Sequence, residues 1–439
     1  MFSFLNWEQF HNYDWSVFLT HIGPTIDFKS ATAQRRLTEA LLYLDFNISL
    51  TLPDNRLCPP VPNRLNYVLW VQDIVKTFVP GDDIVRGIDI GTGASAIYPL
   101  LACRLEPKWS IVATDIDRVS LVSARQNVEI NGLSDRITII DMSSSESILQ
   151  PLDGLLSVPF HFTMCNPPFY ASMEEVAQST EAKEYGPNAV CTGAEIEMVT
   201  PGGEASFVSR IFAESLRHGM QCKWYTSMLG KMSSLPLIVG ILREHEVDNY
   251  AITEFVQGQT RRWAIAWSFG TLRLPDSLAR IANLILQSIM PHRTSLHQHV
   301  ANVRSLDVLY NTLIQVLRAI EGIHVTPEPS GLHQHSIVLV VATEITWSRS
   351  VRRKKVAPQV SHMTSMGSII MQCRITCTNG PHPIGEKQQA SGPHLVYQWI
   401  DGSEQWGSGK FCQPCQPQSH PPSSNKVSYT NPLASGSLC

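Results

Sequence analysis

The stretch Ile84–Ser95, which reads IVRGIDIGTGAS, decides the fold that we expect for this chain. Its apolar first half has the length of a buried strand and runs directly into Gly91 and Gly93. Glycines allow the backbone to turn sharply there and let a ligand approach closer than a Cβ would permit. The third glycine of the dinucleotide fingerprint is absent, with Ser95 nearby, which counts against pyrophosphate binding. The stretch therefore predicts a strand, a ligand-binding turn and the start of a helix.

Strand-like runs recur around this stretch and alternate with amphipathic segments, of which Val119–Asn131 is the clearest. Such alternation indicates a parallel sheet covered by helices on both faces. Two later runs, Ala251–Val256 and Arg262–Phe269, are typical of an antiparallel pair that closes the sheet. We therefore expect a Rossmann-like α/β sheet of seven strands, whose remaining strands lie in Ser110–Thr114, Ile137–Ile140, Phe160–Cys165 and Cys222–Leu229.

The rest of the chain carries weaker patterns. Helical spacing over Leu278–Met290 and Val303–Ile320, with an apolar run over Ser336–Ile345, predicts a small α/β appendage. Gly, Pro, Ser and Gln dominate the last part, which is typical of disorder. We expect four parts along the chain: an unassigned N-terminal segment over residues 1–25, the sheet domain over 26–271, the appendage over 272–356 and a disordered tail over 357–439.

Composition limits the class of protein. The chain has 439 residues, of which 43% are apolar and 16% charged, so it can bury the core of a globular enzyme. Its formal net charge of −4 argues against nucleic-acid binding by the whole surface and confines such binding to a local patch. No run approaches the roughly 18 apolar residues of a membrane span, and the N-terminus lacks a basic segment followed by an apolar one. We therefore expect a soluble, intracellular protein without membrane contact.

Four late cysteines raise the question of a metal site. Cys373 and Cys377 are followed by Cys412 and Cys415, and paired cysteines can hold zinc. The spacings are loose, however, and the surrounding sequence is rich in Pro, Ser and Gly. We predict no metal and interpret the four cysteines as thiols of a flexible tail.

Two carboxylates follow the strand-like run after the glycine turn. A carboxylate at that place in an α/β sheet can accept hydrogen bonds from both hydroxyls of a ribose. Asp115 comes first after the apolar run, whereas Asp117 suits the N-cap of the next helix. Together with the glycine turn, Asp115 predicts a cofactor that contains adenosine.

The run Asn166–Phe169, which reads NPPF, follows a strand and carries the chemistry. The exocyclic amine of adenine is a poor nucleophile because its lone pair is delocalised into the ring. The Asn166 side-chain oxygen and the Pro167 carbonyl can each accept one N–H, and so favour a tetrahedral nitrogen without a general base. Pro168 adds rigidity to the loop, and Phe169 would stack on an unpaired base. We predict methyl transfer to adenine. Enzymes that methylate a glutamine amide, usually with Tyr in the fourth position, remain the alternative.

At these residues the chain resembles the methyltransferase-like protein 16 family. Its members methylate adenine N6 in U6 small nuclear RNA, and bacterial relatives act on large-subunit ribosomal RNA. The resemblance implies a class I methyltransferase sheet, S-adenosyl-L-methionine as cofactor and a structured RNA with an exposed adenine as partner. It implies a nuclear location, with the cytoplasm as an additional one. The motifs that carry it, within roughly Ile26–Phe269, are Gly87–Ser95, Pro62–Tyr67 with Trp70, Asn166–Phe169, Trp224–Tyr225 with Met228–Lys231, and Gln257–Gly258 with Thr260, Arg262 and Trp263.

The resemblance also implies roles for single residues. Arg64 would pair with the carboxylate of the cofactor, and Asn166–Phe169 would hold the adenine. The implied cofactor contacts are Arg64, Asp89, Gly91, Thr92, Gly93, Ser95, Asp115 and Asn166. The implied RNA contacts are Lys29, Lys231, Arg261 and Arg262.

Three segments depart from the family pattern or add to it. A basic N-terminal arm is not recognisable in Met1–Pro24, and the serine-rich loop Met142–Gln150 lacks the regulatory lysine of relatives. The appendage would be a reduced form of the family's C-terminal RNA-binding region, and the basic run at its end, Ser348–Lys355, suits a nuclear import signal, a phosphate-binding patch or a solvated surface. Ribosomal RNA methylation and RNA binding without catalysis therefore stay open beside the U6 hypothesis.

Overall fold

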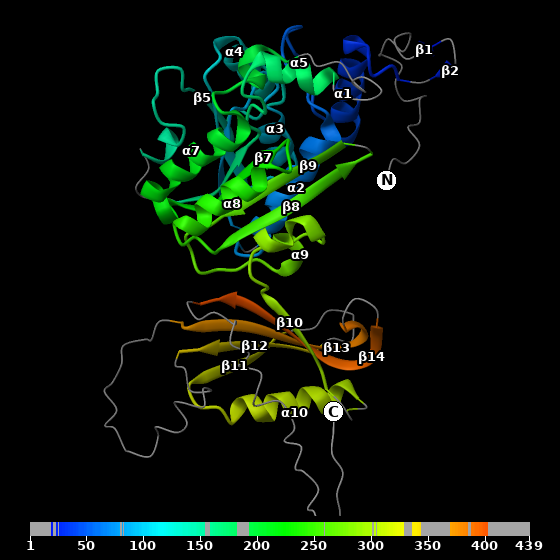
Figure 1. Ribbon diagram of the computed structural model, residues 1–439, viewed down its shortest axis with the longest axis vertical. Coiled ribbons are helices and arrows are strands. Elements are labelled where there is room, and N and C mark those ends of the chain that lie inside the picture. Colours follow the sequence, from blue (N-terminus) through cyan, green and yellow to red (C-terminus); the bar gives the residue numbers. More distant parts are fainter. Residues whose placement is uncertain are drawn as a thin grey trace, which may run out of the picture. The chain divides into compact units, whose positions relative to one another are not determined.

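The computed structural model of the chain describes residues 19–20, 23–24, 26–79, 81, 83–153, 159–181, 193–258, 260–300, 303, 305–328, 336–343, 369–384 and 388–402. The chain separates into two compact units (Figure 1). The first contains Met1–Leu296 with Gln398–Gly402, and the second contains His297–Tyr397 with Ser403–Cys439. Our division of the chain at 271 and 356 stays a prediction.

A seven-stranded sheet forms the centre of the first unit, as the sequence predicts. Its order is β5-β4-β3-β6-β7-β9-β8, and the first five strands in that order run parallel. Strand β9 joins β7 and β8 by antiparallel pairing and closes the sheet. The strands are β3 (Val85–Ile90), β4 (Trp109–Asp115), β5 (Ile137–Asp141), β6 (Phe160–Cys165), β7 (Cys222–Leu229), β8 (Tyr250–Gln257) and β9 (Thr260–Trp267).

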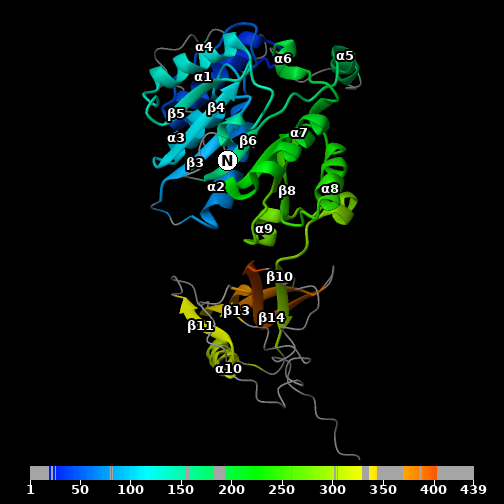
Figure 2. The ribbon, with the colours of Figure 1, turned by 90° about the vertical axis from the view of Figure 1, so that its left-hand side faces the viewer.

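Helices cover the two faces of this sheet, and Figure 2 shows α3 and α4 on one side and α7 and α8 on the other. One apolar core unites residues of α1–α4 with Phe162 and Trp224, and the other unites α7 and α8 with Ile88 and Tyr225. The longer helices are α1 (Ala31–Phe46), α2 (Val61–Lys76), α3 (Ile97–Leu105), α4 (Arg118–Ile130), α5 (Met173–Glu181), α7 (Gly203–His218) and α8 (Ser234–Glu244). The short elements are β1 (Leu19–Thr20), β2 (Gly23–Pro24), η3 (Gln150–Leu152), α6 (Glu195–Met198), η4 (Gly219–Gln221), α9 (Asp276–Ala279) and η5 (Leu284–Ile289).

The strand order explains where a ligand site can form. From β3 the chain adds β4 and β5 on one side and later adds β6 and β7 on the other. The carboxyl ends of β3, β4 and β6 therefore border the point at which the strand order reverses, and ligands of open α/β sheets bind there.

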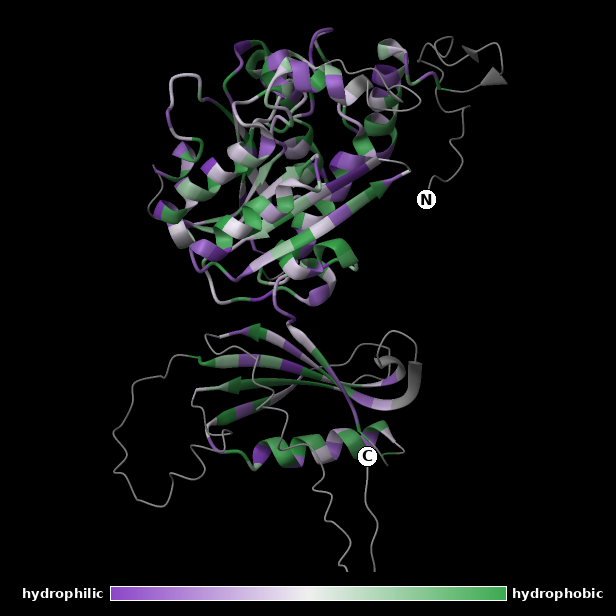
Figure 3. Cartoon of the chain, viewed as in Figure 1, coloured by the Kyte–Doolittle hydropathy of each residue, from purple (hydrophilic) through white to green (hydrophobic). Residues whose placement is uncertain are grey.

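The second unit is centred on a five-stranded sheet of order β10-β14-β13-β12-β11, with α10 packed on β11 and β13. Leu309, Leu313 and Leu317 form the buried stripe of α10, and Figure 3 shows apolar and hydrophilic residues alternating around this helix. The elements are β10 (Ser295–His299), α10 (Leu306–Arg318), β11 (Ile323–Glu328), β12 (Ser336–Ala342), β13 (Met371–Ile384) and β14 (Gln388–Asp401).

The structure corrects two expectations about this part of the chain. Strands β13 and β14 occupy residues of the expected disordered tail, because the buried positions of β13 alternate with half-exposed ones and can fill one face of a sheet. The helical pattern at Leu278–Met290 does not form one helix, since η5 covers only Leu284–Ile289. The prediction of disorder after residue 357 was wrong for β13 because the apolar alternation there is short and lies within a polar region.

The cysteine prediction also changes. Cys373 and Cys377 are buried on β13 and face the same side as Ile375, so they are core thiols rather than residues of a flexible tail. Burial raises the pKa of the Cys377 thiol to about 12. Cys412 and Cys415 lie outside the described residues. Among the residues that are described, no group of three His, Cys, Asp or Glu side chains is placed to hold a metal.

One finding concerns membranes. Of the helices in the described part of the chain, none combines the length and the apolar character needed to span a bilayer.

Candidate cofactor and base site

The glycine turn after β3 adopts the conformation that its sequence predicts. Gly91 has φ of +71° and Gly93 has φ of +64°, a region in which a side chain would be strained. The N–H groups of Gly91 and Thr92 both donate to the carbonyl of Thr114 at 2.9 Å. These bonds tie the turn to the end of β4 and leave its outer side open to a ligand.

A cavity of about 590 Å³ lies against this turn. Seven of the eight expected cofactor residues line it, namely Arg64, Gly91, Thr92, Gly93, Ser95, Asp115 and Asn166. The structure therefore brings together side chains from α2, β3, β4 and β6 that are far apart in the sequence. Asp89 is the exception, because it is buried and does not line the cavity.

Asp89 is 0% exposed, and its carboxylate lies beside the buried hydroxyl of Thr92. Burial raises the pKa of Asp89 to about 7. A buried carboxylate without a cationic partner is costly, and the Thr92 hydroxyl offsets only part of that cost, so this region fits a ligand that carries a cationic amine.

Arg64 is 6% exposed and supplies a buried cation at the other wall of the cavity. Its Nη1 donates to Asn166 Oδ1 at 3.2 Å, and its guanidinium carbon lies 5.6 Å from the centre of the Tyr98 ring. The bond couples α2 to the loop after β6 and fixes the side-chain orientation of Asn166. A half-satisfied guanidinium beside a cavity also fits a ligand carboxylate.

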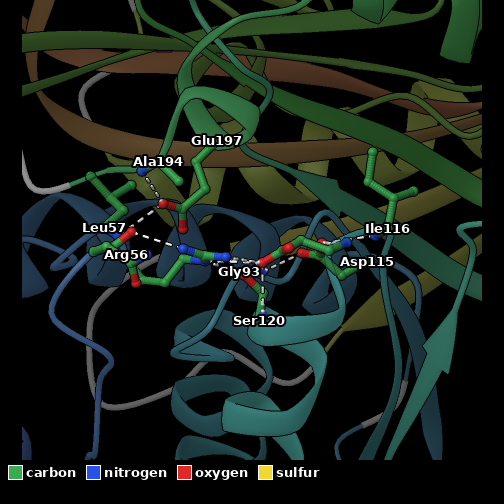
Figure 4. A network of polar contacts seen from close by, with 10 residues as sticks. Arg56, Leu57, Gly93, Asp115, Ile116, Ser120, Ala194 and Glu197 are labelled. Carbon is green, nitrogen blue, oxygen red and sulfur yellow. Dashed lines mark hydrogen bonds and ion pairs between the residues drawn. The ribbon is translucent and has the colours of Figure 1, made fainter.

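Asp115 and Asp117 make different contacts, and Figure 4 shows Asp115 beside Gly93 and Ile116. Asp115 accepts hydrogen bonds from the N–H groups of Gly93, Ile116 and Asp117 at 2.8–2.9 Å and lines the cavity. Asp117 caps α4 through Ser120 N–H at 2.9 Å. Burial raises the pKa of Asp115, although its three N–H donors oppose that effect.

Asp117 also forms an ion pair that holds an edge of the site. Arg56 Nη2 lies 2.7 Å from Asp117 Oδ2, and both side chains are mostly buried. Burial alone would raise the pKa of Asp117, but hydrogen bonds from Ser120 and the charge of Arg56 keep it below its usual value. The segment before α2 is thereby fastened to the start of α4.

The loop Asn166–Phe169 begins where β6 ends. Pro167 is buried, Pro168 lines the cavity with Asn166, and Phe169 lies outside that lining. A Cβ on Gly230 would stand 3.0 Å from two atoms of the Phe169 ring, so only a glycine fits there without displacement. The guanidinium carbon of Arg262 lies 5.4 Å from the centre of the same ring. Phe169 is therefore held between the loop after β7 and strand β9.

The four expected RNA contacts fall into two groups. Arg262 lies beside Phe169, and Lys231 Nζ pairs with Glu175 and lies 5.1 Å from the Tyr170 ring centre. These two cations gather around the Asn166–Phe169 loop. Arg261 instead forms an exposed ion pair with Glu254 at 3.0 Å, and Lys29 is exposed just before α1.

Sequence reasoning missed a buried carboxylate that supports this loop. Glu204 is 1% exposed and accepts from Gly230 N–H at 2.6 Å, Lys231 N–H at 2.9 Å and Ser234 Oγ at 2.7 Å. Burial raises its pKa, and these donors oppose the effect. A lone Glu after Gly202 and Gly203 at a helix start gives little signal in the sequence, because acidic residues are common there.

The serine-rich loop is also part of the cavity wall. Ser143, Ser145 and Ser147 line the cavity, and the side chain of Glu214 accepts from Ser147 Oγ and Leu149 N–H at 2.9 Å. The loop Met142–Gln150, which carries no lysine, is therefore tied to α7 through Glu214, a contact that the sequence did not predict.

The sheet order, the glycine turn, the acid after β4 and the Asn-Pro-Pro-Phe loop around one cavity define a class I methyltransferase that uses S-adenosylmethionine. The sequence pattern of an RNA methyltransferase family matches residues 11–271. The chain belongs to this family of RNA methyltransferases, which confirms the family resemblance.

Three relatives show the range of the family. The U6 small nuclear RNA (adenine-(43)-N(6))-methyltransferase of Schizosaccharomyces pombe is 34% identical over 391 residues, covering 88% of this chain and 93% of the relative. RNA N(6)-adenosine-methyltransferase METTL16 of Homo sapiens is 41% identical over 248 residues, covering 56% of this chain and 44% of the relative. Ribosomal RNA large subunit methyltransferase F of Pseudomonas putida is 36% identical over 266 residues, covering 57% of this chain and 83% of the relative.

Solved structures agree with the fold. The human Mettl16 catalytic domain in complex with MAT2A 3'UTR hairpin 1 gives a TM-score of 0.53 at 41% identity, covering 57% of this chain and 85% of that chain. The complex with hairpin 6 gives a TM-score of 0.51 at 39% identity, covering 59% of this chain and 94% of that chain. The chain therefore matches nearly the whole S. pombe relative and less than half of the human one.

Proposed function

We propose that this protein transfers a methyl group from S-adenosylmethionine to N6 of an unpaired adenine in U6 small nuclear RNA. The hydrogen bond between Arg64 and Asn166 carries the proposal, because it joins the Asn166–Phe169 loop to a charged residue that lines the cavity. The choice of RNA is supported by the S. pombe relative, which is named for U6 and aligns over 93% of its length.

The cavity suits each chemical group of the cofactor, which supplies an electrophilic methyl group when bound. Asp89 offers a buried negative charge for the amine of the methionine part, and Arg64 offers a cation for its carboxylate. The turn Gly91–Ser95 lets the ligand lie against the backbone, and Asp115 offers an acceptor for the ribose. Apart from the buried Asp89, these residues line one cavity.

The loop after β6 would orient the adenine amine. Asn166 Oδ1 accepts one hydrogen bond from Arg64 and, as an amide oxygen, has a second lone pair for an adenine N–H. The Pro167 carbonyl would accept the other N–H, because proline rigidity fixes its direction. Arg64 therefore links recognition of the cofactor to recognition of the base, and the rate gain comes from positioning and electrostatics.

Positive charge near the loop would bind the RNA backbone. Arg262 and Lys231 lie beside Phe169 and Tyr170, where phosphates that flank a flipped adenine would approach. Arg261 and Lys29 would add weaker contacts from exposed positions. We also propose a nuclear location, since U6 small nuclear RNA is the substrate named for the S. pombe relative.

A substrate panel tests this function. Wild-type protein is incubated with labelled S-adenosylmethionine and with a U6 hairpin, a large-subunit ribosomal RNA fragment or a release factor, and the RNA is then digested to nucleosides. We expect label in N6-methyladenosine of the U6 hairpin. Label in the ribosomal fragment alone would move the substrate to that of the P. putida relative. Label in protein alone would contradict the adenine assignment.

A further inference from the structure

Glu197 of α6 is one of the carboxylates that line the cofactor cavity. Its Oε2 accepts hydrogen bonds from Leu57 N–H at 3.0 Å and from Ala194 N–H at 2.8 Å, as Figure 4 shows. These bonds join the segment before α2 to the segment before α6. Glu197 is therefore fixed in place by two backbone donors that lie far apart along the chain.

The other oxygen of Glu197 points to the glycine turn. A Cβ on Gly93 would stand 3.8 Å from Oε1, which places this oxygen beside the turn that would cradle the cofactor. Within the described structure Oε1 accepts no hydrogen bond. The nearby Arg56 guanidinium does not satisfy it, because that group donates to Asp117, Ser120 and the carbonyl of Asn55. A fixed oxygen without a donor thus faces the cavity.

The ribose acid has limited capacity of its own. A carboxylate offers about four lone-pair sites to donors. Three backbone N–H groups already donate to Asp115, two to Oδ1 and one to Oδ2. A ribose presents two vicinal hydroxyls, so Asp115 in this arrangement has room for about one of them. A second acceptor at the same turn would complete the ribose site.

We propose that Glu197 is a cofactor-binding residue whose Oε1 accepts a hydrogen bond from a ribose hydroxyl, so that Asp115 and Glu197 share the ribose. Oε2 keeps the side chain in position through its bonds to Leu57 N–H and Ala194 N–H, which also join the two segments of the cavity wall. Burial raises the pKa of Glu197 and the charge of Arg56 opposes this, which suits a carboxylate in a partly closed site. The inference rests on the proposed cofactor site and adds a residue to it.

The variant Glu197→Gln separates the two oxygens. The two N–H groups at Leu57 and Ala194 should hold the amide oxygen at the Oε2 position, so the amide nitrogen takes the place of Oε1. The wall contacts survive while the charged acceptor at Gly93 is lost. Glu195→Gln, an exposed position on the same short helix, is the matched control.

Calorimetric titration with S-adenosylhomocysteine and with its 2',3'-dideoxyribose analogue provides the test. We expect Glu197→Gln to weaken S-adenosylhomocysteine binding about tenfold, which corresponds to about 1.4 kcal/mol, and to leave the dideoxy analogue unchanged. The control should bind both ligands as wild type does. Glu197→Asp withdraws both oxygens by one methylene group, so it should weaken both ligands through the lost wall contacts but S-adenosylhomocysteine more strongly, and it serves if the amide variant folds poorly.

Two results would overturn the inference. If both Glu197 variants bind S-adenosylhomocysteine with wild-type affinity, Glu197 does not contact the ribose. If the affinity for both ligands falls equally, Glu197 only holds the two walls of the cavity together. In either case wild-type binding would leave the proposed function standing. Wild-type protein that binds neither ligand would overturn the proposed function as well.

Discussion

Gly230→Ala is the substitution that most sharply separates the base site from the cofactor site. The added methyl group would stand 3.0 Å from Cδ1 and Cγ of Phe169 and 3.1 Å from Glu204 Oε2. Ordinary carbon contacts begin at about 3.4 Å, so the ring must move by roughly 0.4 Å or more. Overpacking of this kind costs about 1–3 kcal/mol. If that cost raises the free energy of the transition state with bound adenine, kcat/KM should fall about 10- to 100-fold.

The same substitution should spare the cofactor, since Gly230 does not line the cavity. We expect the affinity for S-adenosylhomocysteine to stay within about twofold of wild type, a difference of about 0.4 kcal/mol. Gly240→Ala is the control, because Gly240 lies in α8 with no atom within 4 Å of the added methyl. That control should keep full activity and gain up to about 1 kcal/mol of stability.

A double variant tests whether Phe169 transmits the effect. In a Phe169→Ala background the methyl of Gly230→Ala has space, so the second substitution should cause little further loss of methyl transfer. Steady-state kinetics on the preferred RNA and calorimetry with S-adenosylhomocysteine are the two measurements. Full activity of Gly230→Ala, or an equal loss of cofactor binding, would refute this account of the base site.

Two further predictions concern charge. Asp89→Asn should raise Tm of the ligand-free protein at pH 8 while weakening S-adenosylhomocysteine binding at least tenfold. The pKa of Asp89 in the folded protein is about 7, above the usual value of 3.8. The folded protein therefore becomes less stable relative to the unfolded chain as pH rises from about 4 to 7. The asparagine side chain does not ionise, so the variant avoids this loss of stability. An unchanged affinity, measured by calorimetry, would show that Asp89 does not face the cofactor amine. Arg56→Met should destabilise the protein by about 2 kcal/mol at pH 7. The pKa of Asp117 is lowered, so the difference should shrink in urea unfolding as pH falls below about 4. A difference that does not depend on pH would contradict the ion-pair explanation.

The sheet domain was predictable because its strands carry a strong local signal. The apolar run Ile84–Ile90 contains β3, the glycine turn and the NPPF loop each follow the end of a strand, and parallel pairing brings these strand ends to one edge. The place of Asp115 and Asp117 followed from spacing alone. Strand β13 escaped prediction, since Met371–Cys377 gives only a short alternation within a polar region.

The missed site residues share a physical reason. Glu197, Glu204 and Glu214 act through backbone N–H groups or loop hydroxyls that lie far along the chain, and a hydrogen-bond partner of that kind leaves no pattern around the residue itself. Arg64 was found only through the family resemblance, because a single Arg in an apolar helix has no periodic meaning. Long-range polar contacts therefore require the fold before they can be recognised.

The central claim is that Asn166 orients the adenine amine for methyl transfer. Single-turnover transfer to a U6 hairpin, followed by nucleoside analysis, should compare wild type, Asn166→Ala and the exposed control Asn55→Ala. We expect N6-methyladenosine from wild type and control, and a rate lower by about 100-fold or more from Asn166→Ala. Methylation by Asn166→Ala at the wild-type rate would contradict the account.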